Sequence, residues 1–252
     1  MGALCSKSRY AVEKQTVSVP YFTPARCEFV CGEHKAEVWP QPIVVPTGPR
    51  GVTGPLVRLD VKGRWLGEMA GAIALVDLPV GRWSTMMAKP VRGPVEAAFA
   101  AGAKAVVVIS NGPTGKIIAL NTDGRKPMFS SPVALLAPKQ ADAFRAGAIE
   151  GASATLHLEG EGGRRPAFNF GGRLDRGKGR WLAISTPRSG WFTCAGERGP
   201  GITAWLWLAR WAVQAVSDHD LAFICNLGHE YEYLGAAEAK AKIAPPVAQT
   251  RF

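Results

Sequence analysis

The stretch Gly71 to Asn111, GAIALVDLPVGRWSTMMAKPVRGPVEAAFAAGAKAVVVISN, decides the fold because it holds one complete strand–helix–strand unit. The apolar runs Ala72 to Leu78 and Ala105 to Ser110 suit strands that are buried on both faces. Between them, Gly93 to Ala103 has the apolar stripe of a helix, and Gly102 is placed to end it. The pattern predicts two parallel strands joined by a right-handed crossover.

The composition is that of a globular protein. The 252 residues are 47% hydrophobic and 20% charged, which allows one large domain or two small ones. No uncharged apolar run reaches the roughly 18 residues that span a bilayer. The beginning of the chain also lacks the apolar centre of about 7–15 residues that secretory signals contain. We therefore expect a soluble, cytoplasmic protein with no membrane partner.

The net charge of +10 raises the question of a nucleic-acid partner. The basic residues are scattered, and the densest groups, Arg164–Arg165 and the basic residues of 173–180, lie in a Gly-rich stretch and not along a helix. A solvated linker explains this pattern better, so no nucleic-acid binding is predicted.

The five cysteines form an odd and widely spaced set, which is typical of reduced thiols. Cys27 and Cys31, with His34 nearby, have the spacing of half a zinc site. No second pair of Cys or His residues follows at a useful distance. We expect buried or surface thiols here and no metal.

The rest of the chain divides around the crossover. Residues 1–27 show no sustained period and predict a loose arm with one candidate strand at Thr16–Val19. Residues 28–160 add short strands, tight turns and a second helix, opened by Pro138, to the crossover. Residues 161–179 are dense in Gly and Arg and predict a linker between two domains.

Residues 180–252 predict a second, smaller α/β unit. A strand at Arg180–Ser185, a helix at Gly201–Val216 and a strand at Leu221–Asn226 repeat the crossover pattern. The helix is apolar almost all round, which predicts that it is buried with its three tryptophans in the core. In sheets of this kind, loops at the carboxyl ends of the strands carry the functional site.

Residues 28–160 resemble the protease-associated domain. The strand GAIALVDLP, the helix end EAAFAAGAKA and the strand VVVISN follow that family's pattern of G-x-I-A-L-V, A-x-x-A-G-A-x-A and V-V-V-x-x-N. The resemblance implies a swivelling β/α domain that has no catalytic residues of its own. It also implies a role in substrate access or protein contact.

The second unit resembles the first part of the co-catalytic di-zinc aminopeptidase family, which includes glutamate carboxypeptidases and the transferrin-receptor ectodomain. RWLAISTPRSGW lies where the family has a strand ending in H-x-D-S, and GERGPGITAWLWLAR lies at its D-N-x-S-G-V-x-x-L-L-x-x-A-R. LAFICNLGHEYEYLGA lies at its I-x-F-x-x-x-x-x-E-E-x-x-L-x-G-S, and Asn169 matches an asparagine before the first strand. The resemblance implies an incomplete aminopeptidase-like sheet.

The metal ligands of that family are mostly replaced. Thr186 stands at the histidine position and Arg188 at the aspartate position, and an arginine repels a metal ion. Glu197 stands at the bridging aspartate, next to Arg198, which could pair with it. A two-metal centre needs ligands on both cations and a carboxylate base, so this set predicts no bound metal unless the family's zinc chemistry persists in altered form.

The glutamate pair of the family is also changed. His229 stands at the general-base glutamate, and Glu230 alone keeps the identity of a family ligand. The family's last two ligands lie further along its chain than Phe252, the last residue here. A fragment, one half of a two-chain assembly and a truncated gene product are all compatible with that pattern.

A metal-free site is the alternative. Ser189 or Cys194 would be the nucleophile, His229 the base, and Glu230 or Glu197 the group that orients it, all on loops at one sheet edge. The sequence therefore predicts a non-catalytic or altered relative of the zinc aminopeptidases that contacts a protein or peptide. An active peptidase or amidohydrolase, completed by a second chain or a homo-oligomer, is the competing hypothesis.

Overall fold

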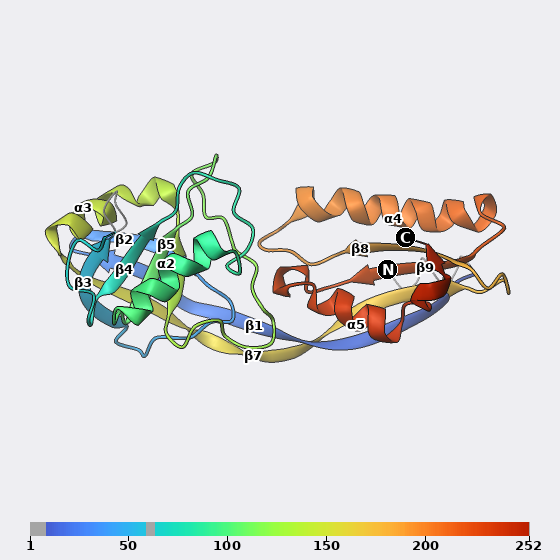
Figure 1. Ribbon diagram of the computed structural model, residues 1–252, viewed down its shortest axis with the longest axis horizontal. Coiled ribbons are helices and arrows are strands. Elements are labelled where there is room, and N and C mark those ends of the chain that lie inside the picture. The colour runs from blue at the N-terminus through green and yellow to red at the C-terminus, as the bar shows by residue number, and fades with distance from the viewer. Residues whose placement is uncertain (1–8, 59–63, 252) are drawn as a thin grey trace. The chain divides into compact units, whose positions relative to one another are not determined.

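The computed structural model describes residues 9–58 and 64–251 and has a mixed α/β fold (Figure 1). The chain divides into two compact units. Unit 1 consists of Met1–Val19 with Arg164–Phe252, and unit 2 is Pro20–Gly163. Two long strands, β1 (Ala11–Cys31) and β7 (Ser153–Leu174), pair with one another and contribute residues to both units.

Unit 2 contains the predicted crossover. Its other elements are β2 (His34–Pro40), β3 (Val52–Arg58), β4 (Ile73–Asp77), α2 (Lys89–Ala100), β5 (Ala105–Ile109), β6 (Val133–Leu136), the 3-10 turn η1 (Pro138–Gln140) and α3 (Asp142–Glu150). The strand order is β1-β2-β6-β5-β4-β3-β7. Strands β3, β4, β5 and β6 pair in parallel, while β2 and β7 are antiparallel to β6 and β3. The parallel pairing predicted for β4 and β5 is confirmed.

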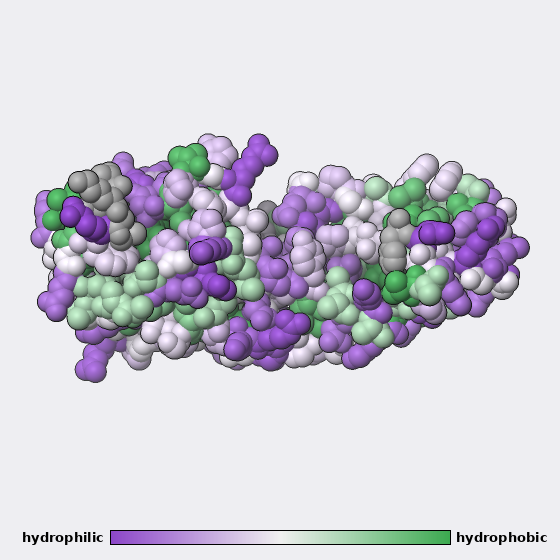
Figure 2. Space-filling model, viewed as in Figure 1, coloured by the Kyte–Doolittle hydropathy of each residue, from purple (hydrophilic) through white to green (hydrophobic). Residues whose placement is uncertain are grey.

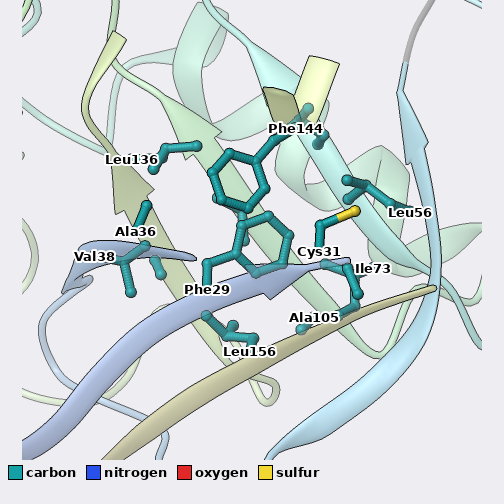
Figure 3. Close-up of a cluster of buried hydrophobic side chains, with 14 of the residues drawn as sticks. Phe29, Cys31, Ala36, Val38, Leu56, Ile73, Ala105, Leu136, Phe144 and Leu156 are labelled. Carbon is teal, nitrogen blue, oxygen red and sulfur yellow. The ribbon is translucent and has the colours of Figure 1, made fainter. Parts of the chain in front are cut away.

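Successive side chains of the central strands point to opposite faces of the sheet and build two separate cores in unit 2. One set of side chains packs with Phe29 and with α3, and it includes Ile73, Leu75, Val107, Ile109 and Leu136. Figure 3 shows this core, in which the rings of Phe29 and Phe144 stack with their centroids 4.8 Å apart. The alternate set packs with α2, and it includes Ala74, Val76, Val106, Val108 and Leu135. Both faces of the sheet are therefore buried, as continuous apolar strands require.

Helix α2 begins four residues before the predicted start. Pro90 occupies its first turn, where a missing N–H costs nothing, whereas Pro94 lies inside the helix and removes one of its hydrogen bonds. It ends at Ala100, three residues before the predicted bound. Gly102, the residue expected to stop it, has φ +97°, and a Cβ there would lie 3.1 Å from Cα of Ala70. Glycine is required at this position both for its conformation and for the close approach.

Helix α3 is tied to the carboxyl ends of β4 and β5 by an ion pair. Arg145 binds both carboxylate oxygens of Asp77, at 2.7 and 3.0 Å, and Asn111 donates to the same carboxylate at 2.6 Å. Partial burial raises the pKa of Asp77, but the hydrogen bonds from Arg145 and Asn111 outweigh it and hold the pKa below its usual range. This sheet edge of unit 2 is thus occupied by a satisfied structural network.

Unit 1 is a smaller sheet between two helices. Its elements are β8 (Trp181–Pro187), α4 (Ala195–Ala215), β9 (Asp220–Asn226), the 3-10 turn η2 (His229–Tyr231), α5 (Leu234–Lys242), the 3-10 turn η3 (Val247–Gln249) and β10 (Thr250–Arg251). The strand order is β7-β9-β8-β10, and β8 and β9 are parallel. Helices α4 and α5 lie on opposite sides of this sheet (Figure 1). Leu221 and Phe223 pack with α4, whereas Ile224 packs with α5.

The prediction that the helix at Gly201–Val216 is buried on nearly all sides was wrong for one face. Helix α4 begins at Ala195, earlier than expected, and Trp205 is 3% exposed in the core. Trp207 and Trp211 stack on each other on the surface and are 61% and 47% exposed. On the side seen in Figure 2, hydrophobic residues reach the surface among polar ones in the region of α4. The sheet covers only one face of this helix.

Two segments predicted to be irregular are strand. Residues 11–27, taken as a loose arm, lie in β1, and residues 161–174 of the predicted linker lie in β7. Gly160 explains how a Gly-rich segment can be a strand here. A Cβ at this position would lie 2.3 Å from the carbonyl oxygen of Thr23 and 2.7 Å from the ring of Phe22. The glycine therefore permits a close approach of β1.

The cysteine residues that resemble half a zinc site lie in a hairpin of unit 2. Cys31 pairs in register with His34, and burial raises the pKa of the thiols of both Cys27 and Cys31. The four cysteines in the described part of the chain are free thiols. Across the described ranges, no helix is long and apolar enough to cross a bilayer.

Candidate functional site

The candidate site lies at the carboxyl ends of the parallel strands β8 and β9 in unit 1. Ser189 follows β8, and His229 and Glu230 follow β9 in the turn η2. The main-chain N–H of Arg188 donates to the carbonyl of Asn226 at 2.8 Å, which extends the pairing of the two strands by one step. Both loops therefore start from the same edge of the sheet.

Ser189 and Glu230 are directly hydrogen bonded. The Ser189 hydroxyl donates to Oε2 of Glu230 at 2.6 Å and accepts the N–H of Gly228 at 2.8 Å. Glu230 is 4% exposed, so its carboxylate depends on such partners. The hydroxyl of Ser189 thus bridges the two loops.

Arg198 supplies the positive charge beside this pair. Its Nη2 lies 3.0 Å from Oε1 of Glu230, and its Nη1 lies 2.8 Å from Oε1 of Glu197. Its Nε donates to the main-chain carbonyl of Ser189. The pairing with Glu197 follows from their adjacency in the sequence, but the pairing with Glu230 joins residues that are far apart in the chain.

His229 is close in sequence to Glu230 but is not joined to Ser189. Among the described residues, no hydrogen bond links the two side chains, and the imidazole ring instead contacts the edge of Tyr233, with the ring centroids 4.7 Å apart. Tyr231 in the same turn packs against Trp191 at 5.7 Å. Burial, followed by the charge of Glu230, raises the pKa of Tyr231 to about 12, so this phenol is not ionised near neutral pH.

The two residues that replace the family's first ligands have structural partners. Thr186 is 6% exposed and donates its hydroxyl to the carbonyl of Pro187 at 3.4 Å. Arg188 donates through Nε and Nη2 to the carbonyl of Phe168, and its guanidinium lies 5.4 Å from the ring centroid of Phe170. Neither position supplies a ligand suited to zinc.

Cys194 has the wrong electrostatic surroundings for a nucleophile. Its thiol donates to Oε2 of Glu197 at 3.1 Å. Burial and this neighbouring carboxylate raise the pKa of the Cys194 thiol. Reactive cysteines instead have a lowered pKa, because the thiolate is the nucleophile.

Asn169 is the residue at the centre of this part of unit 1. It is fully buried, accepts the N–H of Leu227 at 3.0 Å, and donates to Oε1 of Gln15 and to the carbonyl of Gly235, both at 2.8 Å. Gln15 was missed by the sequence analysis because it lies in the segment taken as a loose arm. Its only local signal is the alternation of polar and apolar residues along Thr16–Val19.

The side chains of this site do not fit a two-zinc centre. Residues 9–58 and 64–251 contain no group of three or more His, Cys, Asp or Glu side chains that is placed to hold a metal ion. The two acids at family-like ligand positions, Glu197 and Glu230, both pair with Arg198. A metal ion would have to compete with a fixed guanidinium for these oxygens.

The comparisons with known proteins agree with this architecture. The family model of the PA domain matches residues 52–147, which include β3, the crossover and most of α3. A sequence comparison with curated proteins finds no significant match. The chain therefore contains a PA domain, within a fold that extends beyond the matched residues.

Solved structures show the same fold over nearly the whole chain. BSAP, a zinc aminopeptidase from Bacillus subtilis, has a TM-score of 0.77 at 20% identity and covers 99% of this chain. An aminopeptidase from Aneurinibacillus sp. strain AM-1 has a TM-score of 0.67 at 22% identity over 98% of the chain, and a Peptidase M28 precursor from Shewanella amazonensis SB2B has 0.71 at 17% identity over 95%. The fold is thus that of PA-domain zinc aminopeptidases, and this chain spans only 59–60% of the length of these three proteins.

Proposed function

We propose that this protein is a non-catalytic relative of the zinc aminopeptidases that binds a protein or peptide and does not cleave it. The single observation that carries this proposal is that both carboxylate oxygens of Glu230 already have partners within the protein. One oxygen accepts the hydroxyl of Ser189 and the other pairs with Arg198. A zinc ion or a substrate proton would have to compete with Ser189 and Arg198 for this carboxylate.

The absence of a nucleophile–base pair supports the same proposal. Nucleophilic catalysis by Ser189 requires a base within about 3 Å that can take its proton and return it. His229 makes no hydrogen bond to Ser189 within the described ranges, and Glu230 is already neutralised by an arginine.

A binding role would fall to the PA domain. In unit 2 the loop between β4 and α2 presents Val80, which is 80% exposed, and Met87, which is 38% exposed. Loops at the carboxyl ends of strands are the usual place for recognition in α/β sheets. We place the protein in the cytoplasm, where the free thiols of its four described cysteines would remain reduced.

Peptide binding and peptide cleavage can be measured in one experiment on the full chain. Fluorescently labelled peptides, prepared by digesting an unfolded protein, are incubated with the full chain. Binding is followed by fluorescence anisotropy, and the masses of the recovered peptides are measured by mass spectrometry. The proposal predicts that bound peptides are recovered intact, with or without added zinc. A Val80→Glu variant should bind more weakly, and Val247→Glu, at an equally apolar exposed position in unit 1, should bind as the wild type does.

Two outcomes would contradict the proposal and identify the alternative. Removal of one N-terminal residue, abolished by EDTA, would indicate an active zinc aminopeptidase. Cleavage that resists EDTA but is lost in a Ser189→Ala variant would indicate a metal-free hydrolase that uses the remodelled site.

A further inference from the structure

Arg198 has a position that the sequence resemblance does not explain. Its side chain is only 12% exposed, although it carries a permanent charge. All three guanidinium nitrogens are used: Nη1 by Glu197, Nη2 by Glu230, and Nε by the carbonyl of Ser189. A buried charge with this many partners is held in one place and has little freedom to swing into solvent.

The three partners of Arg198 come from three separate segments. Ser189 lies in the loop after β8, Glu197 in the first turn of α4, and Glu230 in the turn after β9. Without a cation, the two carboxylates would keep only the neutral donors Ser189 and Cys194, and no positive charge would balance them. Glu230, with a side chain only 5% exposed, would then be a buried charge without a counter-ion.

We infer that Arg198 is a built-in cation: its guanidinium supplies the positive charge for the two family-like metal-ligand positions, Glu197 and Glu230, and so ties three loops together without a metal ion. This inference deepens the proposed function at the same site. It rests on that proposal in one respect, namely that the site has no resident metal.

The position of Arg198 in helix α4 is a second argument that its role is to bind these carboxylates. Cys194, which precedes α4, makes no side-chain cap, so the first turn of the helix has only the acidic Glu197 to balance its positive end. Arg198 in that same turn is unfavourable for the helix by itself, because it adds positive charge near the positive end of the dipole. Its placement makes physical sense only with the carboxylates that it binds.

Thermal unfolding of four full-length proteins tests the inference: the wild type, Arg198→Met, Glu230→Gln and the double variant. Arg198→Met should lower Tm by about 5–15 °C, because it leaves the charge of Glu230 buried and unpaired. The matched control Arg210→Met, on the exposed face of the same helix, should change Tm by no more than about 2 °C.

The double variant distinguishes a cation from mere packing of the arginine stem. Glu230→Gln removes the charge that needs Arg198, so adding it to Arg198→Met should raise Tm above that of Arg198→Met alone. If Arg198→Met does not fold, recovery of folded double variant supports the inference, and failure of both contradicts it. A wild-type Tm for Arg198→Met, or additive losses in the double variant, would also overturn it.

The wild type should melt at the same temperature in EDTA and in buffer that contains zinc. A Tm that falls in EDTA would overturn the inference, because a metal would then supply the charge. Failure of the proposed function is recognised separately. Peptide cleavage in the mass-spectrometric experiment would refute the non-catalytic role and leave these differences in Tm unchanged.

Discussion

The hydroxyl of Ser189 donates to Glu230 at 2.6 Å while it accepts the N–H of Gly228 at 2.8 Å, so one side chain satisfies groups on both sides of the candidate site. In the family that the sequence resembles, the region around these residues performs chemistry. In this chain the same region is a closed network of hydrogen bonds with Arg198 as its cation. A network of this kind is expected to respond to substitution mainly through stability.

Ser189→Ala should therefore lower the free energy of unfolding by about 1–3 kcal/mol, because a buried carboxylate and an N–H group each lose a partner. Urea unfolding at neutral pH measures this change. Ser217→Ala is the control, since Ser217 is exposed on the surface of the same unit and should change stability by less than about 0.5 kcal/mol. Equal stability of the two variants would show that the network contributes nothing.

The tryptophans of α4 should differ sharply in their contribution to stability. Trp205 is buried and donates its ring N–H to the carbonyl of Ile184 at 3.2 Å, so Trp205→Ala should cost about 3–5 kcal/mol. Trp207 is 61% exposed, so Trp207→Ala should cost about 1 kcal/mol, most of it from lost stacking on Trp211. Similar losses in both variants, measured by urea unfolding, would refute the one-sided burial of this helix.

Two helical glycines form another matched pair. A Cβ on Gly235 would lie 2.1 Å from the carbonyl oxygen of Leu227 and 2.9 Å from Oδ1 of Asn169, so Gly235→Ala should displace α5 and destabilise unit 1 by at least about 2 kcal/mol. A Cβ on Gly199 would meet nothing within 4 Å, so Gly199→Ala should stabilise α4 by about 0.5–1 kcal/mol. Differential scanning calorimetry should show Tm shifts of opposite sign. A rise in Tm for Gly235→Ala would contradict the packing of α5.

Asp220 should make stability depend on acid pH. Burial raises the pKa of its carboxyl, but N–H groups of Arg176, Lys178 and Gly179 outweigh this effect and hold the pKa below its usual value. The contribution of Asp220 is therefore fully present above the unfolded-state pKa of about 3.9 and is lost as pH falls through the lower folded-state pKa.

Urea unfolding between pH 7 and pH 2.5 tests this effect. Asp220→Asn should be less stable at pH 7 and should lose less stability than the wild type as the pH falls. Glu33→Gln is a control at an exposed turn residue and should keep the wild-type pH dependence. A decline in Asp220→Asn as steep as in the wild type would place the acid sensitivity elsewhere.

The crossover of unit 2 could be predicted because the residues that determine each of its elements lie within that element. Each apolar run of the β4–α2–β5 unit has its own period, and Gly102 ends the helix for a reason that is visible in the residue type. The long strand β7 could not be predicted in this way. Its glycines suit the strand only because Tyr21 and Phe22 of β1 pack on Gly163 and Gly162, and a partner distant in the sequence leaves no local signal.

The candidate site, like the fold, could be predicted only in part. The rule that parallel strands carry their sites at their carboxyl ends brought Ser189 and Glu230 to one edge of the sheet, and the structure joins them. It could not show that Arg198 reaches Glu230, because a helix residue can pair with many neighbours. Nor could it show that the ring of His229 lies against Tyr233, which depends on the left-handed backbone of Glu232 and Tyr233.

Calorimetric titration of the metal-free full chain with zinc chloride tests the central claim most directly. The account predicts no zinc site in which Glu230 takes part. The wild type and the Glu230→Gln variant should therefore give the same titration, and any zinc binding in either should be weak, with a Kd above about 10⁻⁴ M. Two zinc ions bound per wild-type chain at micromolar or tighter Kd, and lost in Glu230→Gln, would contradict it.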